Sequence, residues 1–144
     1  MKFIIAAAVV IAVLSVGLIY LPLGGDESAD GSVGSVEGAE IVSVALPDAL
    51  TQNAQIGQRA YDANCAACHG INAAGREGIA PPLVHIIYEP SHHADESFQR
   101  AVSLGVRAHH WPFGDMPAVE GLTRGDVTLI TAYIRELQRA NGIN

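Results

Sequence analysis

The sequence predicts an all-α domain of three or more helices, preceded by an N-terminal transmembrane helix. The C-terminal stretch places apolar residues at helical spacing, the middle is broken by glycine and proline, and residues 3–23 carry no charge. A chain of 144 residues has room for one globular domain with appendages. We therefore expect a membrane anchor or uncleaved signal at residues 1–23, a linker at 24–49 and the folded domain at 50–144.

The N-terminal run from Phe3 to Leu23 is rich in Ile, Val, Ala and Leu. At about 1.5 Å of rise per residue, a helix over this run is roughly 30 Å long, which matches the hydrocarbon core of a bilayer. A cleaved signal peptide is the alternative, because a basic start and an apolar run serve both purposes. No convincing small-x-small cleavage site follows the run, and Tyr20 near its outer end suits an interfacial aromatic. We favour a retained anchor, with Lys2 on the cytoplasmic side.

The linker segment, residues 24–49, consists mainly of Gly, Ser, Ala, Val and acidic residues without a helical apolar stripe. Such a segment buries too little apolar surface to offset the entropy of ordering, so we expect it to be flexible. Residues 24–45 carry acids but no basic residue: Asp26, Glu27, Asp30, Glu37 and Glu40. The whole chain has a net charge of −7, which argues against nucleic-acid binding.

The first helix of the domain is expected from about Thr51 or Gln52 into the run Cys65-Ala66-Ala67-Cys68-His69. Gly57, Tyr61 and the first cysteine follow at intervals of four, so they share one helix face. A glycine inside a helix costs about 1 kcal/mol relative to alanine, so it indicates a close packing contact.

The Cys-x-x-Cys-His run is the attachment signature of a c-type haem. Two intervening residues let one helical turn present the Cys65 and Cys68 sulfurs to one porphyrin edge for thioether bonds, with His69 beneath the iron as proximal ligand. A redox dithiol or half of a zinc site would be the alternatives. A zinc site needs two further ligands and the chain has only these two cysteines, while a dithiol needs no trailing histidine. Haem attachment is therefore favoured.

A long loop follows His69, because glycines and prolines recur up to residue 90, and such a loop suits the wrapping of a prosthetic group. A short helix is expected over Glu96–Leu104, with Asp95 as its N-cap and Gly105 as its stop. Its inward residues are expected to be Phe98, Ala101 and Val102. Residues 106–122 are expected to be irregular.

The last helix has the clearest signals. Thr123 is a plausible N-cap with Asp126 in the capping-box position, and Gly142 supplies a stop. The apolar stripe consists of Val127, Ile130, Ile134 and Leu137.

Met116 is the predicted second axial ligand of the iron. It is the only methionine beyond the first residue, and it lies in an irregular loop directly before Pro117. Filling a gap in the core is the alternative role. The rival ligands are the loop histidines, His85, His92, His93, His109 and His110. His/Met ligation fills both axial positions, as an electron carrier needs, whereas a gas sensor or oxygenase needs a vacancy.

Residues 50–142 resemble a class I cytochrome c. The features that carry the resemblance are Gly57, Tyr61, Cys65–Gly70, Pro81 with Leu83, Met116-Pro117 and Ala132-Tyr133-Ile134-Arg135. The resemblance implies a cytochrome c fold around one covalently attached haem c, with the first and last helices crossing at Gly57/Tyr61 against Ile130/Tyr133. It also implies that the Pro81 carbonyl accepts the Nδ1 proton of His69, which sets the imidazole tautomer.

The Gly-Asp-Met-Pro loop after His109-His110-Trp111 is similar to that of small single-haem bacterial cytochromes, many of them membrane-anchored. The resemblance implies a one-electron carrier rather than an enzyme, with no catalytic residues, in a bacterial respiratory or photosynthetic chain. The expected location is the cytoplasmic membrane, crossed once, with the haem domain in the periplasm. Expected partners are a quinol–cytochrome c oxidoreductase, a terminal oxidase or similar proteins. The lysine collar of mitochondrial carriers is absent, because Lys2 is the only lysine.

Two alternatives stay open at this point. One is a haem peroxidase or haem-based sensor with an exchangeable sixth ligand, for which His92, His93, His109 and His110 would supply acid–base groups. The other is a fixed cytochrome subunit of a larger respiratory complex. Candidate donors to the haem propionates, by residue type only, are Arg107, Trp111, Tyr88 and the neighbouring histidines.

Overall fold

The computed structural model describes residues 36–144, so the expected anchor at 1–23 and the first half of the linker lie outside the described residues. The described elements are α2 (Gln52–Asn64), α3 (Ala66–His69), the 3₁₀ turns η1 (Ile71–Ala73) and η2 (Ile86–Tyr88), α4 (Asp95–Leu104) and α5 (Arg124–Ala140). Within this range there are no β-strands, only two isolated bridges. The all-α prediction for the domain is confirmed. In the same range, no helix is both long enough and apolar enough to cross a membrane.

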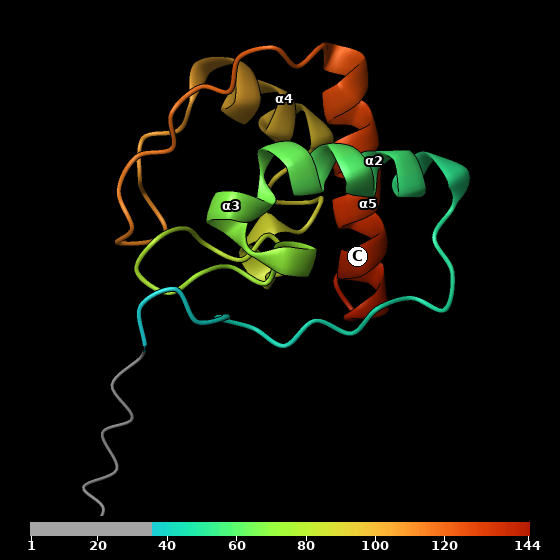
Figure 1. Ribbon diagram of the computed structural model, residues 1–144, viewed down its shortest axis with the longest axis horizontal. Coiled ribbons are helices and arrows are strands. Elements are labelled where there is room, and N and C mark those ends of the chain that lie inside the picture. Colours follow the sequence, from blue (N-terminus) through green and yellow to red (C-terminus); the bar gives the residue numbers. More distant parts are fainter. Residues whose placement is uncertain (1–35) are drawn as a thin grey trace, which may run out of the picture. The chain divides into compact units, whose positions relative to one another are not determined.

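Helices α2 and α5 cross at the centre of the domain (Figure 1). Gly57 allows the close approach, because a Cβ atom there would lie 1.9 Å from the carbonyl oxygen of Leu129. The Tyr61 and Tyr133 rings lie beside this contact, fully buried, with their centroids 5.6 Å apart. The two helices thus meet at the residues that the resemblance implied, Gly57 and Tyr61 of α2 against Ile130 and Tyr133 of α5.

Helix α5 begins and packs as predicted. Thr123 Oγ1 accepts from the Asp126 backbone N–H at 3.2 Å, and the Asp126 carboxylate accepts from the Thr123 backbone N–H at 2.9 Å. This capping box satisfies N–H groups that the first helical turn leaves unpaired. The predicted apolar stripe is buried at all four positions: Val127, Ile130, Ile134 and Leu137.

Helix α4 begins one residue earlier than predicted, and Asp95 is not its cap. The N-cap position is held by Ala94, without a side-chain hydrogen bond, and Asp95 is the first helical residue. The Asp95 carboxylate instead accepts from Arg135 Nε at 2.9 Å. An ion pair with a buried arginine of α5 outweighs local capping here, and an acid in the first turn still complements the helix dipole. Gly105 ends the helix as predicted, with φ of 74°.

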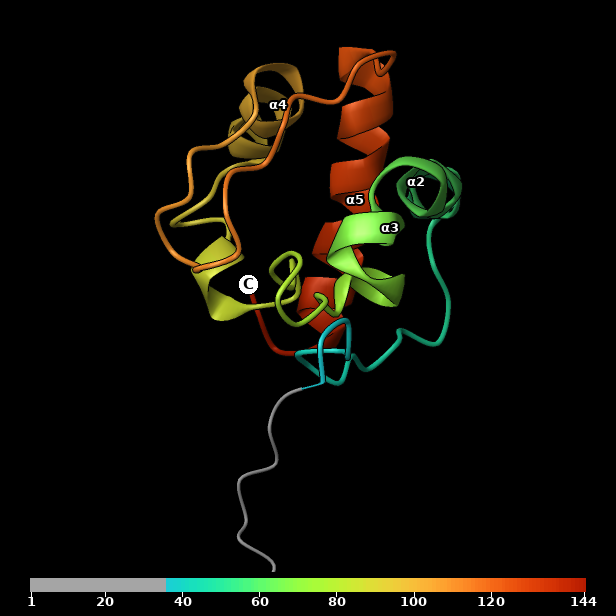
Figure 2. The ribbon, with the colours of Figure 1, turned by 60° about the vertical axis from the view of Figure 1, so that its left-hand side comes forward.

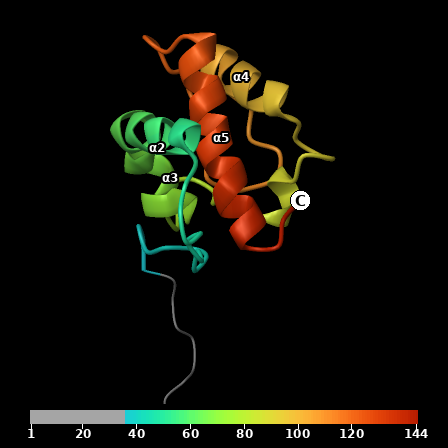
Figure 3. The same ribbon diagram turned by 90° about the vertical axis from the view of Figure 1, so that its right-hand side faces the viewer.

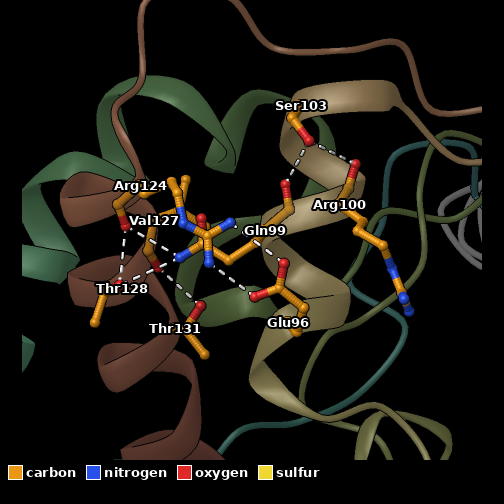
Figure 4. A network of polar contacts seen from close by, with 8 residues as sticks. All are labelled: Glu96, Gln99, Arg100, Ser103, Arg124, Val127, Thr128 and Thr131. Carbon is orange, nitrogen blue, oxygen red and sulfur yellow. Dashed lines mark hydrogen bonds and ion pairs between the residues drawn. The ribbon is translucent and has the colours of Figure 1, made fainter.

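Polar side chains join α4 to the beginning of α5, on a different side of α5 from α2 (Figure 3). Figure 4 shows this contact: Gln99 Nε2 donates to the Arg124 carbonyl at 3.0 Å and to Thr128 Oγ1 at 3.2 Å. Glu96 pairs with Arg124 at 2.9 Å on the surface. These contacts hold α4 as one wall of the space beside α5.

The second half of the predicted linker lies along the domain, contrary to the expectation of flexibility up to residue 49 (Figure 2). Gly38 N–H donates to the Glu77 carbonyl at 2.8 Å, and Glu77 N–H donates to the Ala39 carbonyl at 2.8 Å. Further along, the Asn141 side chain makes two hydrogen bonds of 2.9 Å with the Ala45 backbone. These bonds involve mainly backbone groups, which is why the composition of the segment did not indicate them.

Candidate functional site

The Cys-x-x-Cys-His run forms a separate helical turn at the end of α2. Cys65 ends α2 with φ of −121°, which breaks the helix, and its carbonyl then accepts from the N–H groups of Cys68 and His69. The turn presents three side chains of graded exposure: Cys68 is exposed, Cys65 half-buried and His69 buried. All three line one cavity of about 630 Å³, a size typical of cofactor and ligand pockets.

His69 is fixed in one tautomer. Its Nδ1 atom lies 2.9 Å from the Pro81 carbonyl oxygen. A carbonyl only accepts, so Nδ1 carries the proton and Nε2 keeps its lone pair. Burial lowers the pKa of His69, although the hydrogen bond to Pro81 partly offsets this effect. At neutral pH the ring is therefore uncharged, as a metal ligand must be.

The loop after His69 is tied back onto the motif. The Tyr61 hydroxyl donates to the Gly70 carbonyl at 2.9 Å, and the Gly75 N–H donates to the His69 carbonyl at 2.8 Å. The Tyr61 hydroxyl is buried between α2 and this loop, and burial raises its pKa. These bonds hold Pro81 at the position where it meets His69.

The pKa of Cys65 argues against a redox dithiol. Burial, with a smaller effect from Cys68, raises the pKa of Cys65 to about 11. Reactive dithiols need a lowered pKa, because the thiolate is the attacking species.

Met116 lines the same cavity as His69 and comes from a loop that closes on itself. Its backbone pairs with Val106 through two hydrogen bonds of 2.9 Å, N–H to carbonyl in each direction. A Cβ atom at Gly105 would lie 2.5 Å from the Met116 carbonyl oxygen, and Gly105 has φ of +74°, so only glycine fits there. Asp115 supports the loop by accepting from the Ala108 N–H at 2.8 Å.

The remaining candidates divide between the cavity and its surroundings. His93, His109, His110, Arg107 and Tyr88 line the cavity, whereas His85 and His92 do not. Four of these histidines form a group: His92, His93, His109 and His110. The sequence offers these four residues as possible acid–base groups, but it does not indicate that they lie together, because the two pairs belong to different loops.

Trp111 stands out among the candidate propionate donors. Its Nε1 atom is buried, lines the cavity region and has no hydrogen-bond partner among the described residues. Burial raises the pKa of the nearby Tyr88 to about 12, and the Trp111 indole opposes this increase. The indole N–H nevertheless makes no hydrogen bond with the Tyr88 hydroxyl. A buried unpaired N–H costs about 1–3 kcal/mol, so among the candidates Trp111 has the N–H group that gains most from an acceptor.

The residues present fit a covalently bound haem. The cavity offers two thiols at one edge, a neutral imidazole, a thioether and an unpaired N–H donor. The sequence model of the cytochrome c family matches residues 54–138, which is more than half of the chain. A search of curated proteins found no match. The match covers the helix crossing, the attachment motif and the Met116 loop, and the chain therefore belongs to the class I c-type cytochromes, haem-based electron carriers with a covalently attached haem c.

Proposed function

We propose that this cytochrome is a one-electron carrier in which His69 and Met116 are the two axial ligands of the haem iron. The observation that carries the proposal is that both side chains line one cavity while belonging to separately anchored segments. His69 is held by Pro81 at 2.9 Å, and the Met116 backbone is held by Val106. Of the loop histidines, His93 also lines the cavity and its Nδ1 atom is held by the Ile87 carbonyl at 2.6 Å, so it is the main rival of Met116 as second ligand.

The haem supplies a one-electron couple at its iron when bound. The protein contributes a neutral imidazole in a fixed tautomer and a thioether, which together exclude exogenous ligands and raise the potential relative to two imidazoles. The His69 ring is anchored by its hydrogen bond to the Pro81 carbonyl, and Met116 is anchored through its own backbone. Prepositioned ligands keep the reorganisation that accompanies a change of charge small.

The exposure of the motif supports outer-sphere transfer. Cys68 is exposed and Cys65 is half-buried, so the attachment edge of the site lies near the surface. A redox partner that docks over this edge comes close to the haem without entering the domain. No group needs to be exchanged or transformed for this activity.

We also propose that the protein works at the outer face of a bacterial cytoplasmic membrane, with the uncharged run at residues 3–23 as its anchor. The partners proposed are a quinol–cytochrome c oxidoreductase, a terminal oxidase or a similar protein. Purification from native membranes checks this proposal: co-migration with one stable complex at all salt concentrations would indicate a fixed subunit instead of a tethered carrier. A mature chain that lacks residues 1–23 would contradict the anchor.

A methyl-labelling experiment tests the axial ligation. The chain contains two methionines, so a ¹³C-methyl methionine label gives two signals, from Met1 and Met116. In the reduced protein we expect one of them far upfield, because a methyl group bound through sulfur above the porphyrin ring experiences its ring current. The Met1 signal is the internal control. Two signals at ordinary positions, together with carbon monoxide binding by the reduced protein, would favour a peroxidase or sensor.

A further inference from the structure

Two loops bring four histidines together at the rim of the haem cavity. His92 and His93 lie between η2 and α4, and His109 and His110 lie in the loop that leads to Met116. One ring nitrogen from each of His92, His93 and His110 lies within 4.8 Å of the other two. We propose that these three side chains bind one divalent transition-metal ion of the Zn²⁺ or Cu²⁺ type, separate from the haem iron. This site goes beyond the proposed function and does not depend on Met116 ligation.

The donor set suits such an ion. Imidazole is a preferred ligand of zinc, copper and nickel, and three histidines plus water complete a four-coordinate site. Zn–N bonds of about 2.0–2.1 Å place ligand nitrogens roughly 3.3 Å apart in a tetrahedron. The present separation of up to 4.8 Å closes by rotation of His92 and His110, which are exposed. Neither ring makes a side-chain hydrogen bond within the described part of the chain, so rotation of either ring breaks no such bond.

His93 provides the fixed ligand of the site. Its Nδ1 atom donates to the Ile87 carbonyl oxygen at 2.6 Å, which leaves the Nε2 lone pair available. Metal-binding histidines usually donate their second ring N–H to a carbonyl or carboxylate in this way. The His93 carbonyl in turn accepts from Arg135 Nη2 at 2.5 Å, and Arg135 also holds the Tyr88 carbonyl at 2.7 Å. The buried arginine of α5 therefore secures the loop that carries His92 and His93.

The rings of the cluster also pack against one another. The His92 and His93 rings are stacked with centroids 4.7 Å apart, and the His110 ring lies 5.3 Å from His93. Burial first, and then the neighbouring histidines, lower the pKa of His93 and of His110. Arg135 adds to this effect at His93. A single cation held between these neighbouring rings would accept a lone pair from each of them.

A metal ion at this position should be coupled to the haem. His93 and His110 line the same cavity as His69 and Met116, so the ion adds positive charge beside the redox centre. Added positive charge favours the reduced state, and by linkage the ion binds more tightly to reduced than to oxidised protein. Each tenfold ratio between the two affinities corresponds to about 59 mV in the potential of a one-electron couple.

Zinc titration of the full-length haem-loaded protein tests the proposal, with Zn²⁺ as the probe because it is redox-inert. We expect one ion per chain by calorimetry, with tighter binding to the reduced form. His92→Gln and His110→Gln should each lower the affinity at least tenfold, and the double variant should abolish binding. Both positions are exposed, so an unchanged haem spectrum verifies that the variants are folded.

His85→Asn is the matched control. His85 lies outside the cluster, and Asn keeps an acceptor near the position of Nδ1, which the Ile87 N–H contacts at 3.2 Å. This variant should bind Zn²⁺ like the wild type. Equal binding by wild type and the double variant would overturn the proposal. Equal affinity in both oxidation states would also overturn it, because the ion would then lie away from the cavity rim.

Discussion

Val106 and Met116 exchange two backbone hydrogen bonds, each 2.9 Å long, and thereby close the loop between them. The bridge holds the methionine through its backbone and leaves its side chain free to line the cavity opposite the backbone pairing. The same loop carries His109, His110 and Trp111, so one pair of hydrogen bonds closes the segment that holds these three cavity-lining residues and Met116.

Replacing Met116 by Ala should open the sixth position of the iron. The variant should bind carbon monoxide in the reduced state and imidazole in the oxidised state, and its potential should fall. The axial ligand is among the levers that span about 0.8 V across haem proteins, so the fall should be well above experimental error. Val102→Ala, which truncates another cavity-lining side chain, should remain closed to both ligands. If Met116→Ala keeps a low-spin spectrum and its potential, a loop histidine is the ligand.

Gly57→Ala should destabilise the haem-loaded protein strongly. The added methyl group would lie 1.9 Å from the Leu129 carbonyl oxygen, so α2 and α5 would have to separate. Overpacking of this kind costs about 1–3 kcal/mol or more, measured as a lower midpoint of denaturant unfolding. Gly125→Ala is the control within α5, because its nearest contact would be an ordinary 3.6 Å. That variant should be neutral or stabilised by up to about 1 kcal/mol, and equal losses in both variants would contradict the packing explanation.

The capping box of α5 should give part of the stability a dependence on acid pH. Hydrogen bonds from the Thr123 side chain and backbone lower the pKa of Asp126. A carboxyl whose pKa is lower in the folded chain favours folding when ionised. Its contribution is therefore present above the ordinary value of about 3.9 and is lost as the pH falls through the lowered value. Thr123→Ala should cost about 1 kcal/mol at pH 7.

Asp126→Asn separates this effect from general acid unfolding. Unfolding midpoints measured from pH 6 downwards should show a shallower decline for the variant than for wild type in the acid range. Parallel curves would mean that Asp126 has the same pKa in the folded and unfolded chain.

The two central helices were predictable because their side chains carry the information. Helix α5 is predicted by the apolar stripe from Val127 to Leu137 and by the Thr123/Asp126 pair. Gly57 indicates the close crossing with α2. The prediction of Asp95 as an N-cap was wrong, because its carboxylate pairs with Arg135 of a helix far along the chain. The packing of residues 36–50 and the Val106 bridge rest on backbone hydrogen bonds, which leave no residue pattern in the sequence. The contact among the four histidines could not be predicted for a different reason, since it forms only where two loops meet.

Trp111→Phe tests whether the unpaired indole N–H donates to the bound haem. In the chain alone, Trp111 Nε1 is buried without a partner, so its removal by itself relieves a cost rather than adding one. If a haem carboxylate accepts from it, the variant instead loses a hydrogen bond to a charged group, worth about 1.5–3 kcal/mol in the stability of the haem-loaded protein. Phe keeps most of the ring stacking against Phe113, whose centroid lies 5.7 Å away, so loss of packing contributes little. Denaturant unfolding measures the loss, and the indole N–H resonance of the reduced wild type should be protected from exchange with water. A Phe variant as stable as the wild type would mean that the indole has no acceptor in the haem-loaded protein, and the carboxylates would then have to be held by Arg107 or the loop histidines.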